Sequence, residues 1–311
     1  GVLHPVVNIH WGRAFNLRTH YLLIKTSDTK PIKEVMTTPD SSPFLYTIHE
    51  FIDGESGILL VFLLPHTTRT FKVLRGYTRK LAKHFGGKLL WFQNTPLAKE
   101  SYNLRYYEEG RWQLHWVAWR YWLERCLSGE IPVEPLHEPF PLHPRVKITQ
   151  LDASILQKTW QTGRIPQRQL CKLLKVGPNL LNQRLRFLKA NNIIQYRFAA
   201  TNLGLIESTL LLISGQNMSS ILNLPFSELP EYYLRGISGD ISGCIYMIRL
   251  PQGGFHKLGR ILRETLQTPF TLHLAFTPTG SQWQIPLDHY DWNNHQFNIT
   301  PDIFPLPSTR R

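Results

Sequence analysis

The stretch 148-ITQLDASILQKTWQTGRIPQRQLCKLLKVGPNLLNQRLRFLKANNIIQYRF-198 carries the start and stop signals of three short helices in succession. We expect the first helix to run from about Asp152, which can serve as its N-cap, to Trp160, with Gly163 as its stop. The second helix starts near Pro166, since proline suits a first turn in which its missing N–H is not needed. These two helices open a small three-helix unit.

The third helix opens with Gly177-Pro178, again a cap followed by a first-turn proline, and runs to about Asn191. Leucines recur at i, i+4 and i+7 and form its buried stripe: Leu181, Leu185 and Leu188. The outer face carries Asn179, Gln183, Arg186 and Ala190, with Asn182 and Lys189 beside them. Asn192 can adopt the left-handed conformation that ends many helices.

The charge of this stretch indicates a polyanionic partner. Residues 148–200 hold nine lysines and arginines and one acid. A basic helix that exposes Asn, Gln and Arg suits the major groove of double-stranded DNA, because these side chains pair with adenine and guanine edges. The expected base readers are Asn179, Asn182, Gln183 and Arg186, and the expected phosphate contacts are Lys172, Lys175, Arg184 and Lys189. A helical bundle with a solvated basic face is the alternative.

The sequence of this stretch resembles the winged helix-turn-helix of the Lrp/AsnC family of transcription regulators. The resemblance runs without a gap from Leu151 to about Ile194. The specific pieces are Leu151-Asp152 with Ile155-Leu156, the Gly163-Arg164-Ile165 turn, Leu170, and Arg184 with Leu185, Arg186 and Leu188. Lys175 stands where the inter-helix turn usually carries Gly, and Gly177 replaces the usual Ser or Thr cap. The resemblance implies a DNA-binding transcription regulator.

Strand and helix patterns on both sides of this unit predict two βαββαβ sandwiches. In the first, strands are expected at 16–26, 44–52, 56–65 and 88–93, with a short, poor helix or loop at 28–38 and a helix at 67–86. In the second, strands are expected at 207–214, 232–238, 244–250 and 270–277, with a weak helix at 217–229 and a helix at 253–267. Ser56-Gly57 matches Ser242-Gly243 at an offset of 186, which indicates a duplication. We therefore expect an α+β chain of two ferredoxin-like domains with the winged helix between them. The expected boundaries are 1–130, a proline-rich linker at 131–147, the winged helix at 148–204, and 205–311.

The second sandwich resembles the effector-binding and oligomerisation domain of the same family, over YYLRGISGDISGCIYMIRLP and the helix and strand that follow. That resemblance implies a site for a small molecule such as an amino acid at the turn after the second strand, here Gly239, Asp240 and Ser242. A tight turn that uses Gly and Asp for backbone reasons is the alternative. The two sheets are expected to face each other within one chain or in a homodimer, because open apolar faces need cover.

Two further helices have marked surfaces. The helix at 67–86 should present one basic stripe, which is either solvated or in contact with phosphates: Arg69, Lys72, Arg75, Arg79 and Lys83. The segment HWVAWRYWLERCL (115–127) is apolar nearly all round and is expected to be buried between domains.

Composition narrows the class of protein. The net charge of +13 and the pI near 9.7 favour nucleic acid as the partner. Three widely spaced cysteines fit neither a disulfide framework nor a zinc ribbon and indicate the cytoplasm. No apolar run approaches the ~20 residues that span a bilayer. We expect no metal and no cofactor.

No catalytic motif is visible, so the chain is expected not to be an enzyme. Two other functions stay open. One is a DNA-architectural or scaffold protein that does not read sequence. The other is a tetrapyrrole enzyme, since the siroheme decarboxylases resemble the same two-part architecture; the nearest candidate residue for that chemistry is His49.

The first residues resemble a lead-in to a wing. VVNIHWGRAFNL (6–17) precedes the first sandwich as IIQYRFAATNLGL (193–205) precedes the second, again at an offset of 186. This suggests that about 50 residues of a second headpiece stand upstream in the natural gene. We expect the first dozen residues to form an edge strand or to be disordered.

Overall fold

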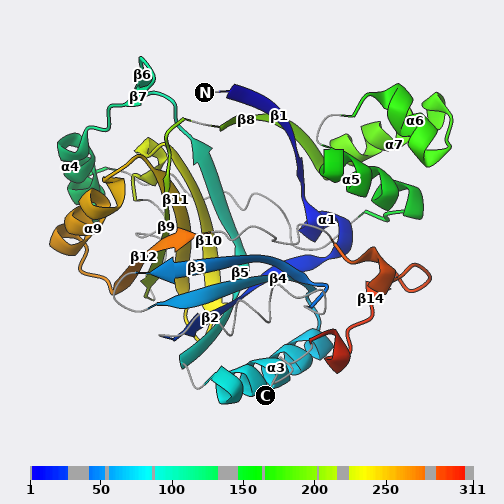
Figure 1. Ribbon diagram of the computed structural model, residues 1–311, viewed down its shortest axis with the longest axis horizontal. Coiled ribbons are helices and arrows are strands. Elements are labelled where there is room, and N and C mark those ends of the chain that lie inside the picture. The colour runs from blue at the N-terminus through cyan, green and yellow to red at the C-terminus, as the bar shows by residue number, and fades with distance from the viewer. Residues whose placement is uncertain are drawn as a thin grey trace, which may run out of the picture.

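A computed structural model describes residues 2–26, 42–52, 56–85, 88–131, 146–162, 165–201, 203–215, 224–276 and 285–304 (Figure 1). The α-helices are α1 (Trp11–Phe15), α3 (Thr68–Phe85), α4 (Trp116–Leu127), α5 (Gln150–Thr162), α6 (Gln167–Leu174), α7 (Pro178–Ala190) and α9 (Gly254–Thr265). The expected short segment at 28–38 and most of the linker at 131–147 lie outside the described residues.

Strands of the first half are β1 (Val2–Ile9), β2 (Leu17–Lys25), β3 (Leu45–Ile52), β4 (Gly57–Pro65) and β5 (Lys88–Tyr102), followed by the hairpin β6 (Tyr107–Glu108) and β7 (Arg111–Trp112). Those of the second half are β8 (Ile194–Thr201), β9 (Glu207–Ser214), β10 (Glu231–Gly239), β11 (Gly243–Leu250) and β12 (Phe270–Phe276), followed by β13 (Tyr290–Asp291) and β14 (Gln296–Phe297). Three 3-10 turns are η1 (Phe226–Glu228), η2 (Leu287–His289) and η3 (Pro301–Ile303); η1 stands in the segment where a weak helix was expected.

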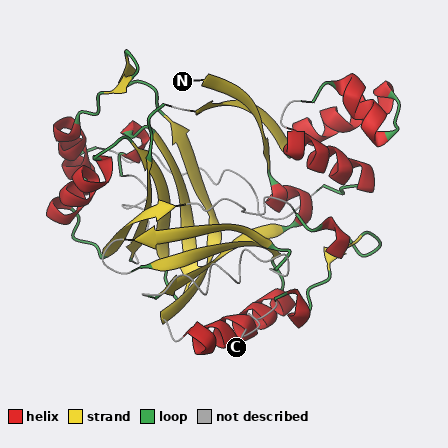
Figure 2. Ribbon diagram, in the orientation of Figure 1, coloured by secondary structure: helices red, strands yellow, loops and turns green. Residues whose placement is uncertain are grey.

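Eight strands close into one barrel (Figures 1 and 2). The order β3-β4-β2-β5 in the first half and β10-β11-β9-β12 in the second is the ferredoxin-like order, repeated. Strand β5 pairs with β10 along Phe92–Tyr102, and β12 pairs with β3 over Leu274–Phe276. The chain is thus mixed α+β, but the two expected sandwiches are not separate domains, because their sheets continue into each other at both edges. The pairing lies within one chain.

Side chains alternate between the inside of the barrel and its outer faces, as strand geometry requires. In β2, Tyr21 and Leu23 point inward, whereas Leu22 and Ile24 point toward α3. The inner cluster draws on both halves, and its fully or nearly buried members include Phe51, Leu59, Phe92, Leu210, Leu212, Ile237 and Ile245. Helix α3 covers the first sheet, and α9 with α4 covers the second. Joining the two sheets therefore buries the apolar faces that each would otherwise expose.

The repeated Ser-Gly pairs begin the third strand of each half. Gly57 pairs with Lys25, and Gly243 pairs with Ser214 at the matching place. A Cβ on Gly57 would lie 2.4 Å from the carbonyl oxygen of Ile24, and one on Gly243 would lie 2.0 Å from that of Ile213. Glycine is needed at both positions because the backbones touch there. The repeat read from the sequence has this physical basis.

Each half sends its last segment onto the other half. Trp119 of α4, a helix of the first half, donates its indole N–H to the carbonyl of Pro225 at 2.9 Å and packs against Phe226. The tail of the second half returns to the first, where Phe304 packs on Tyr77 of α3 with ring centroids 5.0 Å apart. Each half therefore completes the core of the other.

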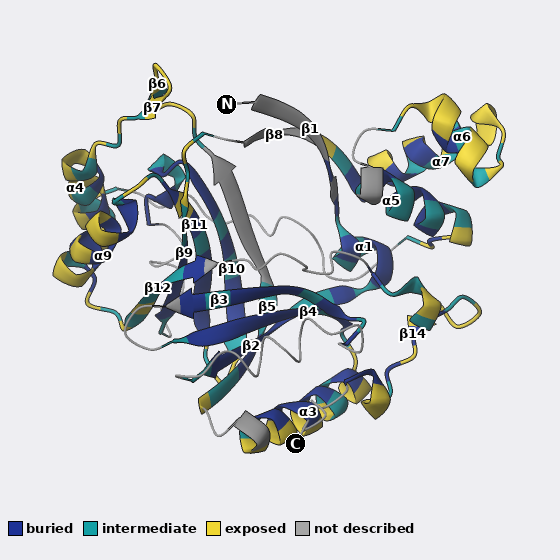
Figure 3. Cartoon of the chain, in the orientation of Figure 1, coloured by how far each residue is buried: buried dark blue, intermediate teal, exposed yellow. Residues whose placement is uncertain are grey.

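Helix α4 is less buried than its composition suggests. Of its side chains only Trp119 and Leu123 are buried. Val117, Tyr121 and Trp122 are 86%, 57% and 50% exposed, so the expectation of a helix enclosed between domains is wrong (Figure 3). The helix lies on the outside of the barrel, where one face meets η1 and α9 and the opposite face meets solvent.

The winged-helix unit is attached to the barrel by β1 and α1. Strand β1 pairs with β8 along its whole length, from Val2 opposite Thr201 to Ile9 opposite Ile194, in a sheet of two strands. Helix α1, which the sequence did not predict, packs Trp11 against Trp160 of α5, and the Arg13 guanidinium donates to the carbonyl of Asn191 at 2.8 Å. The expected edge strand thus exists, but Val7 and Ile9 are buried.

Candidate nucleic-acid interface

The first helix of the candidate interface, α5, starts two residues earlier than its sequence signals suggest. Thr149 stands at the N-cap: its hydroxyl accepts the Asp152 N–H at 3.2 Å, and the Asp152 carboxylate accepts the Thr149 N–H at 2.8 Å. This is a reciprocal capping box. The expectation that Asp152 is itself the N-cap is wrong, because its carboxylate reaches back from the third helical position.

The turn from α6 to α7 has the geometry that the sequence indicates, with one strained residue. Lys175 ends α6 in the left-handed conformation, at φ 54°, where glycine is the usual choice. Gly177 caps α7 in an extended conformation, and Pro178 occupies the first turn. Asn192 has φ 53° and adopts the expected left-handed conformation after the helix. Lys175 is therefore compatible with the turn despite its Cβ.

Helix α7 presents the expected polar face. Leu181, Leu185 and Leu188 are buried, as their spacing predicts. Four of the named side chains of α7 are exposed: Asn179, Gln183, Arg186 and Lys189. Asn182 is half-buried, and Lys172 of α6 and Lys175 are exposed beside this face. Figure 3 shows the outer surfaces of α6 and α7 exposed at one end of the molecule.

Arg184 does not belong to this face. Its guanidinium donates from Nε to the Asp152 carboxylate at 2.7 Å and from Nη2 to the same carboxylate, which is fully buried. The Arg184 carbon Cζ also stacks 4.3 Å from the ring centroid of Phe187. The expected phosphate contact at Arg184 is therefore corrected: a buried carboxylate requires a charged partner, and Arg184 is that partner.

Lys189 is tied to the wing. Its ammonium lies 4.8 Å from the ring centroid of Tyr196 in β8, and both side chains are exposed. This cation–π contact holds the end of α7 and the first strand of the wing in one surface. A nucleic acid that contacts α7 would meet both.

The turn expected to bind an effector is used to join the two sheets. The Asp240 carboxylate accepts the backbone N–H of Trp91 at 2.8 Å, and the Asp240 N–H donates to the Trp91 carbonyl at 2.9 Å. Gly239 has φ 148°, and a Cβ there would lie 2.6 Å from the same carbonyl. The carbonyl of Ser242 accepts the N–H of Gly215 at 3.1 Å. These contacts give the turn a structural role, and they engage one oxygen of the carboxylate.

A buried polar cluster lies beneath α3, next to that turn. His20 is fully buried, stacks on Trp91 at 6.0 Å and contacts Phe71 of α3 at 5.7 Å. Burial, together with the nearby charges of His66 and Arg18, lowers the pKa of His20 to about 3. Neither ring nitrogen of His20 has a hydrogen-bond partner among the described residues. The sequence offered no signal for this cluster, because a single histidine in an apolar strand is common.

The inside of the barrel holds two more histidines. His49 in β3 lies opposite Leu59, and His273 in β12 lies opposite Leu210, so both share the inner face. Burial lowers the pKa of His49 to about 4, which makes the neutral form dominant at pH 7. Burial raises the pKa values of Tyr21 and Tyr46 to about 12, and the positive charge of the nearby Arg235 opposes this rise. Residues of this type can bind a carboxylate through hydrogen bonds and the charge of the guanidinium.

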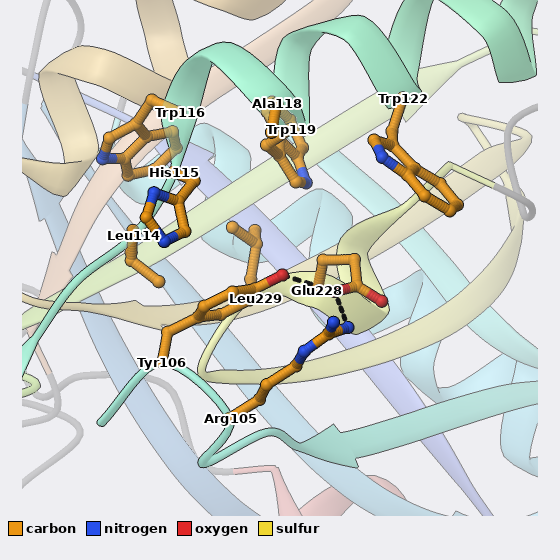
Figure 4. A pocket seen from close by; sticks show the side chains of 10 residues that line it. All are labelled: Arg105, Tyr106, Leu114, His115, Trp116, Ala118, Trp119, Trp122, Glu228 and Leu229. Atoms are coloured by element: carbon orange, nitrogen blue, oxygen red, sulfur yellow. Dashed lines mark hydrogen bonds and ion pairs between the residues drawn. The ribbon is translucent and has the colours of Figure 1, made fainter. Parts of the chain in front are cut away.

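A small pocket of about 140 Å³ lies between α4 and η1 (Figure 4). His115, Trp119 and Trp122 form one wall, and Tyr106 with Glu228 forms the other (Figure 4). The Tyr106 hydroxyl donates to Glu228 at 3.0 Å, and Arg105 lies 3.8 Å from the same carboxylate. The polar groups are thus bonded to one another, and the volume is below the ~300 Å³ typical of ligand sites.

Within the described ranges, no group of three or more His, Cys, Asp or Glu side chains is placed to hold a metal ion. The same part of the chain has no helix of the length and hydropathy that a bilayer span requires.

Comparisons with known proteins concern the fold. No family model and no curated protein matches the chain. The siroheme decarboxylase NirDL is similar, with a TM-score of 0.53 and 14% identity, over 88% of this chain and 75% of that one. Its complex with an iron-uroporphyrin III analogue matches over the same shares, with a TM-score of 0.50 and 12% identity. LrpC of B. subtilis matches 44% of this chain over 100% of its own, with 20% identity and a TM-score of 0.38.

One expectation is overturned by this likeness. The absence of catalytic motifs predicts that the chain is not an enzyme, but an enzyme shares its architecture over 88% of the chain. That conclusion is wrong, because residues that act on a substrate inside such a fold need not form a recognisable motif in sequence.

Proposed function

We propose that the chain is a double-stranded-DNA-binding protein of Lrp/AsnC type that reads sequence through α7 and regulates transcription. The observation that carries this proposal is the exposed row of Asn179, Gln183 and Arg186 on a helix whose leucine face is buried. Amide and guanidinium groups pair with base edges in the major groove, which admits one helix. Lys172, Lys175 and Lys189 flank the row and suit phosphates.

Two side chains are assigned different roles from those expected. Arg184 positions α7 through its bond to Asp152 and is not assigned to DNA. Asn182 is half-buried and is assigned to the edge of the reading face. Effector binding at Gly239, Asp240 and Ser242 stays a proposal, in which the effector would contact Oδ1 of Asp240, the carboxylate oxygen that does not accept the Trp91 N–H.

A selection from random duplexes followed by gel-shift titration tests the proposal. Arg186→Ala should weaken binding to the selected sequence by ~1–3 kcal/mol and relax preference at one base pair. Lys175→Ala should weaken binding to all sequences alike. It should also reduce the slope of log affinity against log salt by about 0.9, the contribution of one phosphate contact. Arg263→Ala on α9, also exposed, is the control and should change neither. No enrichment of any sequence would count against sequence reading and favour an architectural protein.

A second candidate function is a reaction on an acidic tetrapyrrole. It is supported by the fold shared with a siroheme decarboxylase, together with His49, His273 and Arg235 on the inner face of the barrel. In this role Arg235 would hold a carboxylate by its charge, and the neutral imidazole of His49 would donate a hydrogen bond to that group. Addition of iron-uroporphyrin III should then shift its absorption band, and His49→Ala should abolish the shift. An unchanged spectrum would remove this candidate.

A further inference from the structure

Helix α3 has a strongly basic outer face. Six arginines and lysines are exposed along it, and its sequence contains no acid: Arg69, Lys72, Arg75, Arg79, Lys80 and Lys83. At 3.6 residues per turn they fall within an arc of roughly 140° and extend over about 20 Å. Among the described residues no carboxylate forms an ion pair with any of them. Such a concentration of unpaired positive charge is costly unless a polyanion neutralises it.

The equivalent helix of the second half lacks this property. Helix α9 also lies between the third and fourth strands of its sheet, but it exposes Lys257, Arg260 and Arg263 together with Glu264. Glu264 is itself paired with Arg120 of α4. The exposed face of α9 thus carries three cations and one acid, against six cations and no acid on α3, so the fold does not require a face as basic as that of α3 at this place.

The chemistry of the α3 face favours a duplex backbone over a lipid surface. A helix that lies on a membrane inserts large apolar side chains beside its cations. Leu74, Tyr77 and Leu81 of α3 are buried in the core, and no large apolar side chain between Thr68 and Lys83 is exposed. What this part of the face offers is positive charge, which suits the dense phosphates of duplex DNA.

We infer that the outer face of α3 is a second DNA-binding surface, which contacts phosphates without regard to sequence. This inference rests on the proposed DNA-binding function and adds to it a contact outside the winged helix. Arg75 also lies 5.7 Å from the ring centroid of Trp91, so α3 carries its charge beside the turn that joins the sheets.

The test compares two triple variants that remove the same charge. In Lys72→Gln/Arg79→Gln/Lys83→Gln the basic face of α3 is reduced, and in Lys257→Gln/Arg260→Gln/Arg263→Gln the matched face of α9 is reduced. Affinity for a random-sequence duplex of ~30 base pairs is titrated over a range of salt concentrations. Each phosphate contact contributes about 0.9 to the slope of log affinity against log salt, so the α3 variant should lose about 2.7 and the α9 variant nothing. Circular dichroism checks that both variants fold.

Equal slopes for the wild-type protein and the α3 variant, or equal losses in the α3 and α9 variants, would overturn the inference. A loss of binding to vesicles of phosphatidylserine and phosphatidylcholine in the α3 variant, with the DNA slope unchanged, would overturn it in favour of a membrane. Arg186→Ala distinguishes the proposed function from this inference. If Arg186→Ala has no effect on binding while the α3 variant reduces the salt slope, sequence reading by α7 is refuted and the α3 surface is supported. A wild-type chain that binds no duplex at all overturns both.

Discussion

Several ionisable side chains of this protein are buried away from water, and they fall into two kinds. His20 and His49 are each less than a tenth exposed, and burial holds both neutral at pH 7. Asp152 differs from them, because its buried carboxylate is paired with the Arg184 guanidinium. The first kind of residue makes the fold sensitive to acid, and the second makes it sensitive to the loss of one partner.

The pH dependence of the free energy of unfolding should reflect the lowered pKa of His20. An unfolded histidine titrates near 6.5, whereas burial lowers the pKa of His20 to about 3 in the folded chain. The unfolded chain therefore binds more protons between these values, and the free energy of unfolding falls as the pH drops through this window. His20→Leu should remove that contribution, which is on the order of 3 kcal/mol at pH 4. Urea unfolding at pH 7 and pH 4 measures it.

An exposed histidine of α9 provides the control for this measurement. His256→Leu should leave the difference between the two pH values unchanged. If His20→Leu loses as much stability between pH 7 and pH 4 as the wild-type chain does, His20 is not neutral in the folded state. His49 should give a smaller effect of the same sign, because its pKa is about 4.

Elements were predictable from sequence where one local pattern decides them. The continuous apolar run in 56–65 and the leucine spacing in α7 need only the residues themselves. Two properties of the helices could not be predicted from a local pattern. The exposure of α4 depends on what covers it, and an apolar composition does not say. The role of Arg184 depends on Asp152, which lies 32 residues earlier in another helix, so its side chain could not be assigned from the outer face of α7 alone.

The packing of α5 against α7 should depend on that pair. Asp152→Asn removes the charge that Arg184 requires and should lower the free energy of unfolding by about 3–5 kcal/mol, since it leaves one charge partly buried without its partner. Asp152→Asn/Arg184→Met should be more stable than Asp152→Asn, because the unpaired guanidinium is gone. Urea unfolding of the single and double variants measures the coupling. A cost below about 1 kcal/mol for Asp152→Asn would show that the pair is dispensable.

At the level of the whole molecule, the closure of the barrel was the feature that sequence could not show. Strand β5 was predicted to end at residue 93, because NTPLAKESY at 94–102 has no clear alternation and contains proline. In the structure these residues continue the strand and pair with β10, which joins the second half to the first. Pairing between distant strands leaves little trace in either strand alone. The candidate base-reading residues could be predicted from the sequence because they lie on a single helix, α7, whose periodicity is local.

The two seams of the barrel should differ in stability. One runs along most of β10 against β5, and Asp240 adds bonds to Trp91 at its end. Among the residues that the structure describes, the other covers only Leu274–Phe276 against Glu50–Ile52. Short seams open at lower free energy than long ones, because fewer hydrogen bonds and less buried surface are lost. Amide hydrogen exchange followed by mass spectrometry should therefore show earlier exchange at Phe51 and Ala275 than at Tyr233 and Leu234. Equal protection at the two seams would mean that the barrel opens only when the whole chain unfolds.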